Sequence, residues 1–187
     1  MAAGLTTRRF TVEDYYRMAE AGILTPDDRV ELLDGEIAEM TPIGSRHAAC
    51  VDRLTRLLTQ AVGDRAIVRV QNPIRLDRYS EPHPDLALLR PRDDFYAAAH
   101  PGPADVLLVI EVARTSEQID RTVKLPLYAR SGIPTAWLVV LEDDLIFLHE
   151  GPAPDRYRVV RELHRGDRLR LEALGVELSV TDILGPC

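Results

Sequence analysis

The sequence has few cysteines and no long apolar run, which are features of secreted and membrane proteins. Only two of its 187 residues are cysteines, Cys50 and Cys187. Cys50 lies within a helical pattern and Cys187 is the last residue, so we expect no disulfide between them. No apolar run approaches membrane-spanning length, and residues 1–10 lack the apolar core of a signal peptide. These absences predict a cytoplasmic protein without a membrane segment.

Several common functional motifs are also missing. The chain has no Gly-rich phosphate loop, no Gly-x-Ser-x-Gly nucleophile turn and no paired cysteines at zinc spacing. It has no internal repeat and no low-complexity linker, so we expect one domain over residues 1–187. The net charge of −7 and the isoelectric point near 5.3 disfavour a protein that coats nucleic acid. They do not exclude an enzyme that contacts DNA briefly.

The hydrophobic pattern predicts a mixed α/β fold. The pair Asp34-Gly35 separates two short alternating runs, which is a strong hairpin signal. Helical spacing predicts a helix capped by Ser45 that runs through Val62, and another over residues 116–131. Strands are predicted over 67–76, 85–89, 106–112, 136–141, 145–149, 157–162 and 168–171. This order indicates a mixed sheet flanked by helices, with a parallel crossover between the strands at 106–112 and 136–141.

Two carboxylates stand at the ends of consecutive predicted strands. Glu111 is the one acidic residue in the run 106–112 and lies near its C-terminal end, where open α/β sheets bind ligands. Asp85 begins the preceding strand. If these strands are neighbours, the two carboxylates converge and could bind Mg²⁺, with water and phosphate in the remaining positions. Taken alone, each residue also fits a turn or a solvated strand end.

The helix after Glu111 carries a second polar set. Asp120, Lys124 and Tyr128 are spaced at i, i+4 and i+8, so they share one face. A solvated Asp–Lys pair is the plainer interpretation. A cation near Glu111 could instead stabilise a phosphoryl transition state. Pro126 fits this helix only if the helix effectively begins near Asp120 or bends there.

The order and spacing of these residues resemble the bacterial putative restriction endonuclease family, a branch of the PD-(D/E)xK nuclease superfamily. The resemblance rests on residues 30–36, His47, residues 81–87, Glu111-Val112, Asp120, residues 124–130, Gly132-Ile133-Pro134 and Trp137. It covers nearly the whole chain. It implies a single nuclease-like domain over 1–187, with a restriction-endonuclease-like mixed sheet, flanking helices and an N-terminal β-hairpin.

The resemblance also implies a metal site. Asp85 and Glu111 would bind the ion, which would be Mg²⁺ with Mn²⁺ as a substitute. The backbone carbonyl of Val112 would be a further ligand. These roles come from the family pattern, and they agree with the independent expectation that the two carboxylates converge.

The basic side chain of the site is expected on a different element from the two carboxylates. The superfamily has lysine at the third position of its Glu-x-Lys motif, where this chain has Ala113. The resemblance implies that Lys124 supplies this cation from the next helix. Glu31 would be an additional acidic member, although its position fits the solvent face of the hairpin equally well. We interpret His47 as structural, and Arg46, Arg53 and Arg56 as a solvated helix face.

These observations lead to one main hypothesis and two alternatives. The main hypothesis is a magnesium-dependent endonuclease that hydrolyses DNA phosphodiester bonds and acts as a homodimer. The first alternative is a catalytically weak or inactive nuclease-fold module for self-association or partner binding, which Ala113 and the acidic isoelectric point favour. The second is an enzyme that hydrolyses another phosphate ester at the same site.

Overall fold

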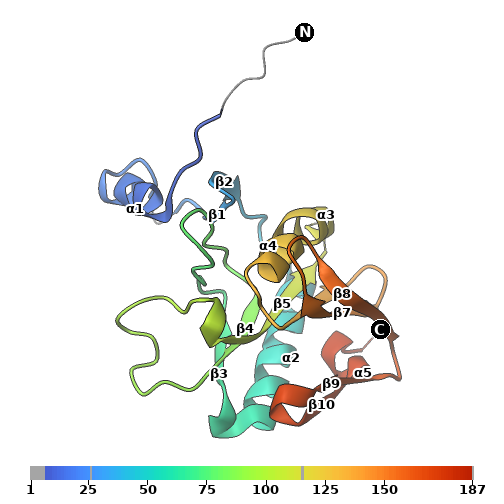
Figure 1. Ribbon diagram of the computed structural model, residues 1–187. Helices are drawn as coiled ribbons and strands as arrows, with labels where there is room; N and C mark the ends of the chain where they lie inside the picture. The colour runs from blue at the N-terminus through green and yellow to red at the C-terminus, as the bar shows by residue number, and fades with distance from the viewer. Residues whose placement is uncertain (1–6, 26, 115, 187) are drawn as a thin grey trace.

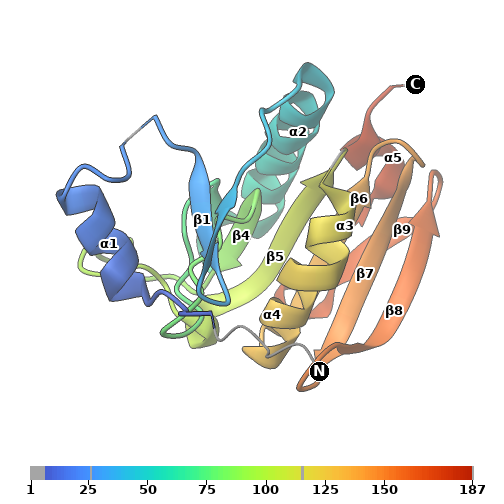
Figure 2. The ribbon, with the colours of Figure 1, turned by 90° about the horizontal axis from the view of Figure 1, so that it is seen from above.

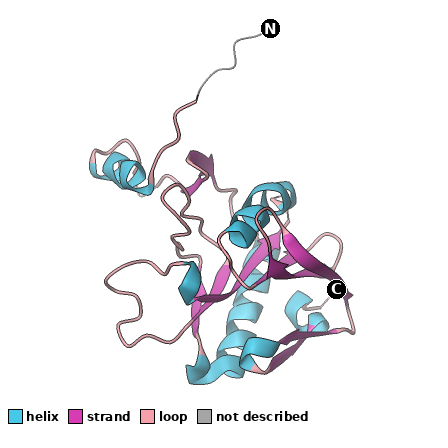
Figure 3. Cartoon of the chain, in the orientation of Figure 1, coloured by secondary structure: helices cyan, strands magenta, loops and turns pink. Residues whose placement is uncertain are grey.

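The fold is organised around one mixed six-stranded sheet. The computed structural model describes residues 7–25, 27–114 and 116–186, so the prediction for Cys187 lies outside the described residues. The strand order is β3-β4-β5-β6-β7-β8. Figure 1 labels most of these strands, and Figure 3 draws the strands in magenta. The strands are β3 (Ile67–Val70), β4 (Leu86–Leu89), β5 (Val106–Ala113), β6 (Thr135–Val140), β7 (Leu145–Pro152) and β8 (Tyr157–His164). β5 and β6 run parallel, and the other neighbours in this sheet are antiparallel. The predicted parallel crossover is therefore confirmed, and its two strands are central in the sheet.

Helices cover both faces of this sheet (Figure 2). On one face α2 (Ser45–Val62) packs through the buried residues Val51, Leu54 and Leu58. The hairpin of β9 (Arg168–Leu171) and β10 (Val176–Ser179) joins the same core cluster, as does α5 (Val180–Leu184). On the other face, α4 (Leu125–Arg130) contributes buried side chains to a second cluster. Short 3₁₀ turns occur at Gly63–Arg65, Pro103–Asp105 and Glu172–Leu174.

The N-terminal elements form a separate layer beside the sheet (Figure 1). α1 (Val12–Glu20) begins with a capping box between Thr11 and Asp14. The predicted hairpin follows as β1 (Val30–Leu33) and β2 (Glu36–Glu39), which pair antiparallel. Both of its turn residues have positive φ, as a two-residue type I′ turn requires. A β-bridge from β1 to Glu81 connects the hairpin to the segment before β4.

The helix after β5 contains a π-helical turn. It consists of α3 (Glu117–Ile119), η3 (Asp120–Lys124) and α4. The N–H of Leu125 donates to the carbonyl of Asp120, which is the wide π-type bond. A new α-helical segment therefore begins at Leu125, and Pro126 lies in its first turn, where a missing N–H is tolerated. This change of winding confirms that the proline needs a break near Asp120.

Three sequence predictions about elements were wrong or incomplete. β3 ends at Val70 instead of residue 76, because Gln71 adopts a left-handed conformation with φ of 49° that ends the extended strand. The N-cap of α2 is Gly44, so the helix start has no side-chain capping hydrogen bond. Ser45, the predicted cap, is the first helical residue. β10 and α5 were not predicted. Their short apolar runs are stabilised by tertiary packing and give little periodic signal.

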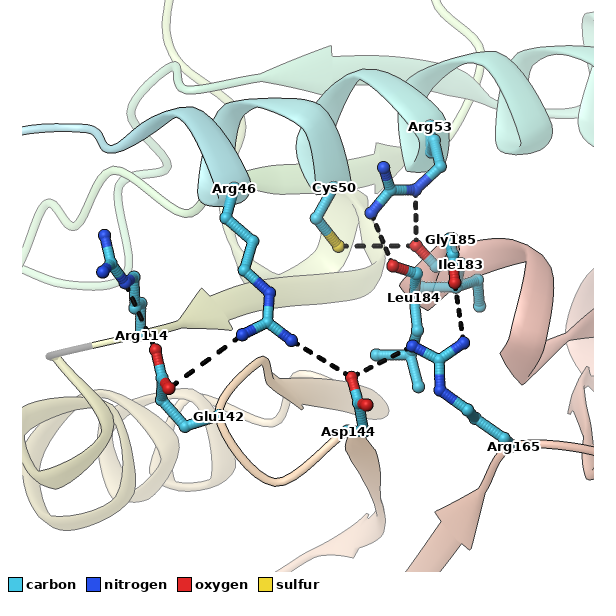
Figure 4. Close-up of polar contacts among 10 residues, drawn as sticks. All are labelled: Arg46, Cys50, Arg53, Arg114, Glu142, Asp144, Arg165, Ile183, Leu184 and Gly185. Atoms are coloured by element: carbon cyan, nitrogen blue, oxygen red, sulfur yellow. Dashed lines mark hydrogen bonds and ion pairs between the residues drawn. The ribbon is translucent and has the colours of Figure 1, made fainter. Parts of the chain in front are cut away.

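The end of α5 is held by one arginine from α2 and one from the turn between β8 and β9 (Figure 4). Arg53 on α2 donates to the carbonyl oxygens of Ile183 and Leu184 at 3.0 and 2.7 Å. Arg165 donates to the carbonyl of Gly185 at 2.7 Å. These bonds satisfy carbonyls that have no partner inside a helix end. The interpretation of Arg53 as part of a solvated face is therefore wrong.

Candidate active site

Asp85 and Glu111 come from adjacent antiparallel strands. In the β4–β5 pairing, Leu86 lies opposite Ile110, so one further step places Asp85 opposite Glu111. The backbone N–H of Val112 donates to Asp85 Oδ2 at 2.9 Å, which fixes the aspartate against the end of β5. The structure therefore brings the two predicted metal-binding carboxylates to the same region of the sheet.

The Asp85 carboxylate is surrounded by hydrogen-bond donors. His47 Nε2 lies 3.1 Å from Oδ2, and Gln71 Nε2 donates to Oδ1 at 3.2 Å. Burial alone would raise the pKa of Asp85. The hydrogen bond and charge of His47, together with the Val112 amide, lower the pKa below its ordinary value. Asp85 is therefore an ionised carboxylate at neutral pH.

Glu111 contacts two side chains from the following helix. The Lys124 ammonium lies 3.0 Å from Glu111 Oε1, and the Tyr128 hydroxyl donates to the same oxygen at 2.5 Å. All three residues are buried. Burial raises the pKa of Glu111 well above its ordinary value, although the positive charge of Lys124 opposes this shift. The alignment of Lys124 and Tyr128 toward Glu111 confirms that they share one helix face.

Lys124 is also held by a carboxylate from the hairpin. Its Nζ lies 3.4 Å from Glu31 Oε2, an oxygen that also accepts a hydrogen bond from the His83 backbone N–H at 2.9 Å. Burial would lower the pKa of Lys124, but Glu111, Glu31 and Asp120 raise it above its ordinary value, so the amine stays protonated. Glu31 is only 6% exposed, so the alternative that it faces solvent is wrong.

Asp120 lies on the same buried helix face. Ser116 Oγ donates to its Oδ2 at 2.8 Å, and burial raises the pKa of Asp120 to about 6. Asp120 and Lys124 are 3% and 5% exposed. The plainer interpretation of these two residues as a solvated surface pair is therefore wrong.

These side chains line one hollow between the hairpin, the start of α2 and the helix after β5. Its volume is about 80 Å³, and its charged lining includes Glu31, Asp85, Glu111, Asp120 and Lys124. Within the described residues, no three His, Cys, Asp or Glu side chains are gathered closely enough to hold a metal ion by themselves. The donor set fits instead a cation held by two carboxylates and completed by water or phosphate oxygens, as Mg²⁺ commonly is.

Similarity to known proteins shows the family and the fold of the chain. A model of the Uma2 family, described as putative restriction endonuclease, matches residues 12–181. The chain belongs to this family. A crystal structure of a putative nuclease of the DUF820 group from Anabaena variabilis is similar, with a TM-score of 0.72 and 11% sequence identity. The match covers 94% of this chain and 97% of that chain and shows a shared fold. No curated protein has a significantly similar sequence.

The basic residues and the helices of this Uma2 family member have two further properties. Lys124 is the only lysine in the sequence, and the other 22 of its 23 basic residues are arginines. The single lysine is thus a buried residue, whereas arginine supplies the remaining basic charge. In the parts of the chain that the structure describes, no helix is long and apolar enough to cross a membrane.

Sequence reasoning missed some contacts of this Uma2 site. The structural interpretation of His47 does not anticipate its hydrogen bond to Asp85, and the strand predicted over 67–76 does not anticipate that Gln71 binds the same carboxylate. His47 and Asp85 are 38 positions apart, and no periodic pattern links residues on separate elements. The left-handed conformation of Gln71 could not be anticipated, because glutamine rarely adopts it.

Proposed function

We propose that this chain is a magnesium-dependent endonuclease that hydrolyses DNA phosphodiester bonds, with a site of the PD-(D/E)xK type. The observation that supports this most is the position of Lys124, the only lysine, buried between Glu111 and Glu31. A buried charge cluster of this kind costs folding free energy unless every charge is compensated. Such clusters are common where a protein performs acid–base or phosphoryl chemistry.

The proposed ligands of the metal ion are Asp85, Glu111 and the carbonyl of Val112. Both described contacts of Glu111 use Oε1, so Oε2 is the oxygen that we assign to the ion. The N–H and C=O of one residue in a strand point to the same edge. Because the Val112 N–H points at Asp85, its carbonyl would face the same edge. When bound, Mg²⁺ or Mn²⁺ would neutralise the scissile phosphate and make water a better nucleophile.

Lys124 would stabilise negative charge that develops on the phosphate during cleavage. Its ammonium is held on two sides by Glu111 and Glu31, so its position is fixed before the substrate arrives. Tyr128 would keep the Glu111 carboxylate in place through its 2.5 Å hydrogen bond. His47 and Gln71 would do the same for Asp85. The proposed catalytic set is thus Asp85, Glu111, Lys124 and Glu31.

Cleavage assays test this proposal directly. Plasmid and single-stranded DNA are incubated with purified protein and either Mg²⁺ or Mn²⁺. We expect cleavage by the wild type and none by Lys124→Met, which keeps the side-chain length but removes the charge. Arg121→Met is the matched control, because Arg121 lies on the same helix but pairs with Glu117 and covers the Phe147 ring. It should cleave like the wild type.

A negative result would favour the interaction module. If the wild type cuts neither DNA and calorimetry detects no Mg²⁺ binding, the chain is a nuclease-fold binding protein. The wild type could bind metal without cleaving DNA and release phosphate or alcohol from a different ester. This result would support the second alternative, an enzyme that hydrolyses another phosphate ester at this site. The homodimer stays a prediction, and light scattering at working concentration tests it.

A further inference from the structure

Two exposed isoleucines flank the mouth of the charged hollow. Ile43, in the segment between β2 and α2, is 40% exposed, and Ile119, on α3, is 44% exposed. Both line the same hollow as Asp85 and Glu111. They come from different elements, and neither belongs to a described core cluster. Large aliphatic side chains exposed together at a concave site are typical of a ligand contact.

The hollow is therefore amphipathic, with charged groups at its base and aliphatic groups at its rim. A matching ligand combines an anionic ester with a flat apolar group attached close to it. An unpaired nucleotide has this combination, because its phosphate and the face of its base are both accessible. In a DNA duplex the base faces are stacked, and isoleucine contacts them only where it wedges base steps apart.

The surroundings of the hollow offer few unpaired cations: Arg29 lines it without an ion pair to another described residue, whereas Arg114 beside it is paired. A second hollow of about 150 Å³ shares Ile43 and His47 with the first and is lined by Arg114. Figure 4 shows that Arg114 and Arg46 reach the same carboxylate, Glu142, and that Arg46 also pairs with Asp144. The whole chain carries a net charge of −7. A duplex is held mainly through many phosphate contacts along both strands, which this surface does not favour.

We propose that the enzyme selects unpaired DNA, with the base next to the scissile phosphate held between Ile43 and Ile119. This inference rests on the proposed nuclease function, since it assigns the substrate class of that site. It makes the two isoleucines specificity-determining residues that contact a base and take no part in bond cleavage.

Binding measurements separate this inference from the chemistry. Fluorescence anisotropy compares one labelled oligonucleotide as a single strand, in a full duplex, and in a duplex with a short mismatched bubble. We expect the wild type to bind the single strand and the bubble at least about fivefold more tightly than the duplex, because the isoleucines bury apolar surface against an unpaired base. The double variant Ile43→Ala/Ile119→Ala should bind all three within about twofold.

The matched control is Ile23→Ala, which removes another exposed isoleucine, 69% exposed and lining a different hollow beside α1. It should keep the preference for unpaired DNA. Equal binding of duplex and single strand by the wild type, or an unchanged preference in the double variant, overturns the inference. Equal cleavage of duplex and bubble also overturns it while leaving the nuclease intact. Selective binding without cleavage under Mg²⁺ or Mn²⁺ overturns the nuclease and supports the base contact.

Discussion

The ammonium of Lys124 lies 3.0 Å from Glu111 Oε1, and both side chains are almost completely buried. Glu31, on β1 of the hairpin, contacts the same ammonium. Replacing one member of such a group leaves buried charges without a counterion, which costs far more than losing a surface ion pair. Stability measurements therefore report on the site independently of catalysis.

We expect Lys124→Ala to lower the free energy of unfolding by about 3 to 5 kcal/mol in the absence of divalent metal. Glu111 and Glu31 would then face each other without the cation. Added Mg²⁺ should restore part of the loss in the variant and stabilise it more than the wild type. Urea denaturation with and without Mg²⁺ measures both effects. Arg121→Ala, which removes a half-buried ion pair and a contact with the Phe147 ring, should lose less than about 2 kcal/mol. Equal losses in the two variants would contradict the buried pair.

Glu111→Gln should remove Mg²⁺ binding while leaving the protein folded. The amide keeps the shape of the carboxylate, and the variant no longer buries this negative charge. Isothermal calorimetry should detect binding in the wild type and none in the variant. Glu81→Gln is a control of the same chemistry, because Glu81 is also buried but is bound by Tyr16. If Glu111→Gln bound Mg²⁺ as well as the wild type, the assignment of Glu111 as a ligand would be wrong.

Much of the site was predictable because its residues follow strong local signals. Asp85 and Glu111 stand at the ends of apolar strands, and Asp34-Gly35 can hardly form anything but a tight turn. Pro126 indicated that the helix must change its winding. These features depend on a few neighbouring residues, which is the range over which sequence patterns are reliable.

The rest depends on contacts between distant segments. Glu31 fits an exposed hairpin face in the sequence, and only the packing of the hairpin against the helix after β5 buries it against Lys124. The pairing of His47 with Asp85 likewise requires α2 to be docked on the sheet. Local propensity carries no information about such docking.

The N-terminal helix is anchored by a buried carboxylate. The Tyr16 hydroxyl donates to Glu81 Oε1 at 2.7 Å, and Glu81 is 1% exposed. Tyr16→Phe should cost about 1–3 kcal/mol, because it removes a charge-assisted bond and leaves the carboxylate less satisfied. Tyr15→Phe removes a neutral bond to the Val30 carbonyl and should cost less. Thermal or urea unfolding ranks the two variants, and the opposite order would refute this anchoring role.

His149 should make stability depend on pH below neutrality. Burial lowers its pKa from 6.5 to about 4, with a smaller contribution from Arg121. As the pH falls from 6.5 to 4, the unfolded chain binds a proton that the native state excludes, so stability decreases by at most about 3 kcal/mol. His149→Phe keeps a ring beside Tyr157 and should flatten this decline. Urea unfolding at several pH values measures it. The same substitution at the exposed His164 is the control. An unchanged pH profile of stability in His149→Phe would rule out the contribution of His149.

The π-helical turn at Asp120–Lys124 amounts to one additional residue within an otherwise regular helix. Deleting one residue there would rotate everything before it by about 100° relative to α4. The helix could then keep Leu125 and Leu127 in the core or keep Asp120 facing Glu111, but not both. The number of residues in this segment is therefore constrained both by the core and by the charged site. Single-residue insertions or deletions should be tolerated far less here than substitutions on the solvent face of the helix.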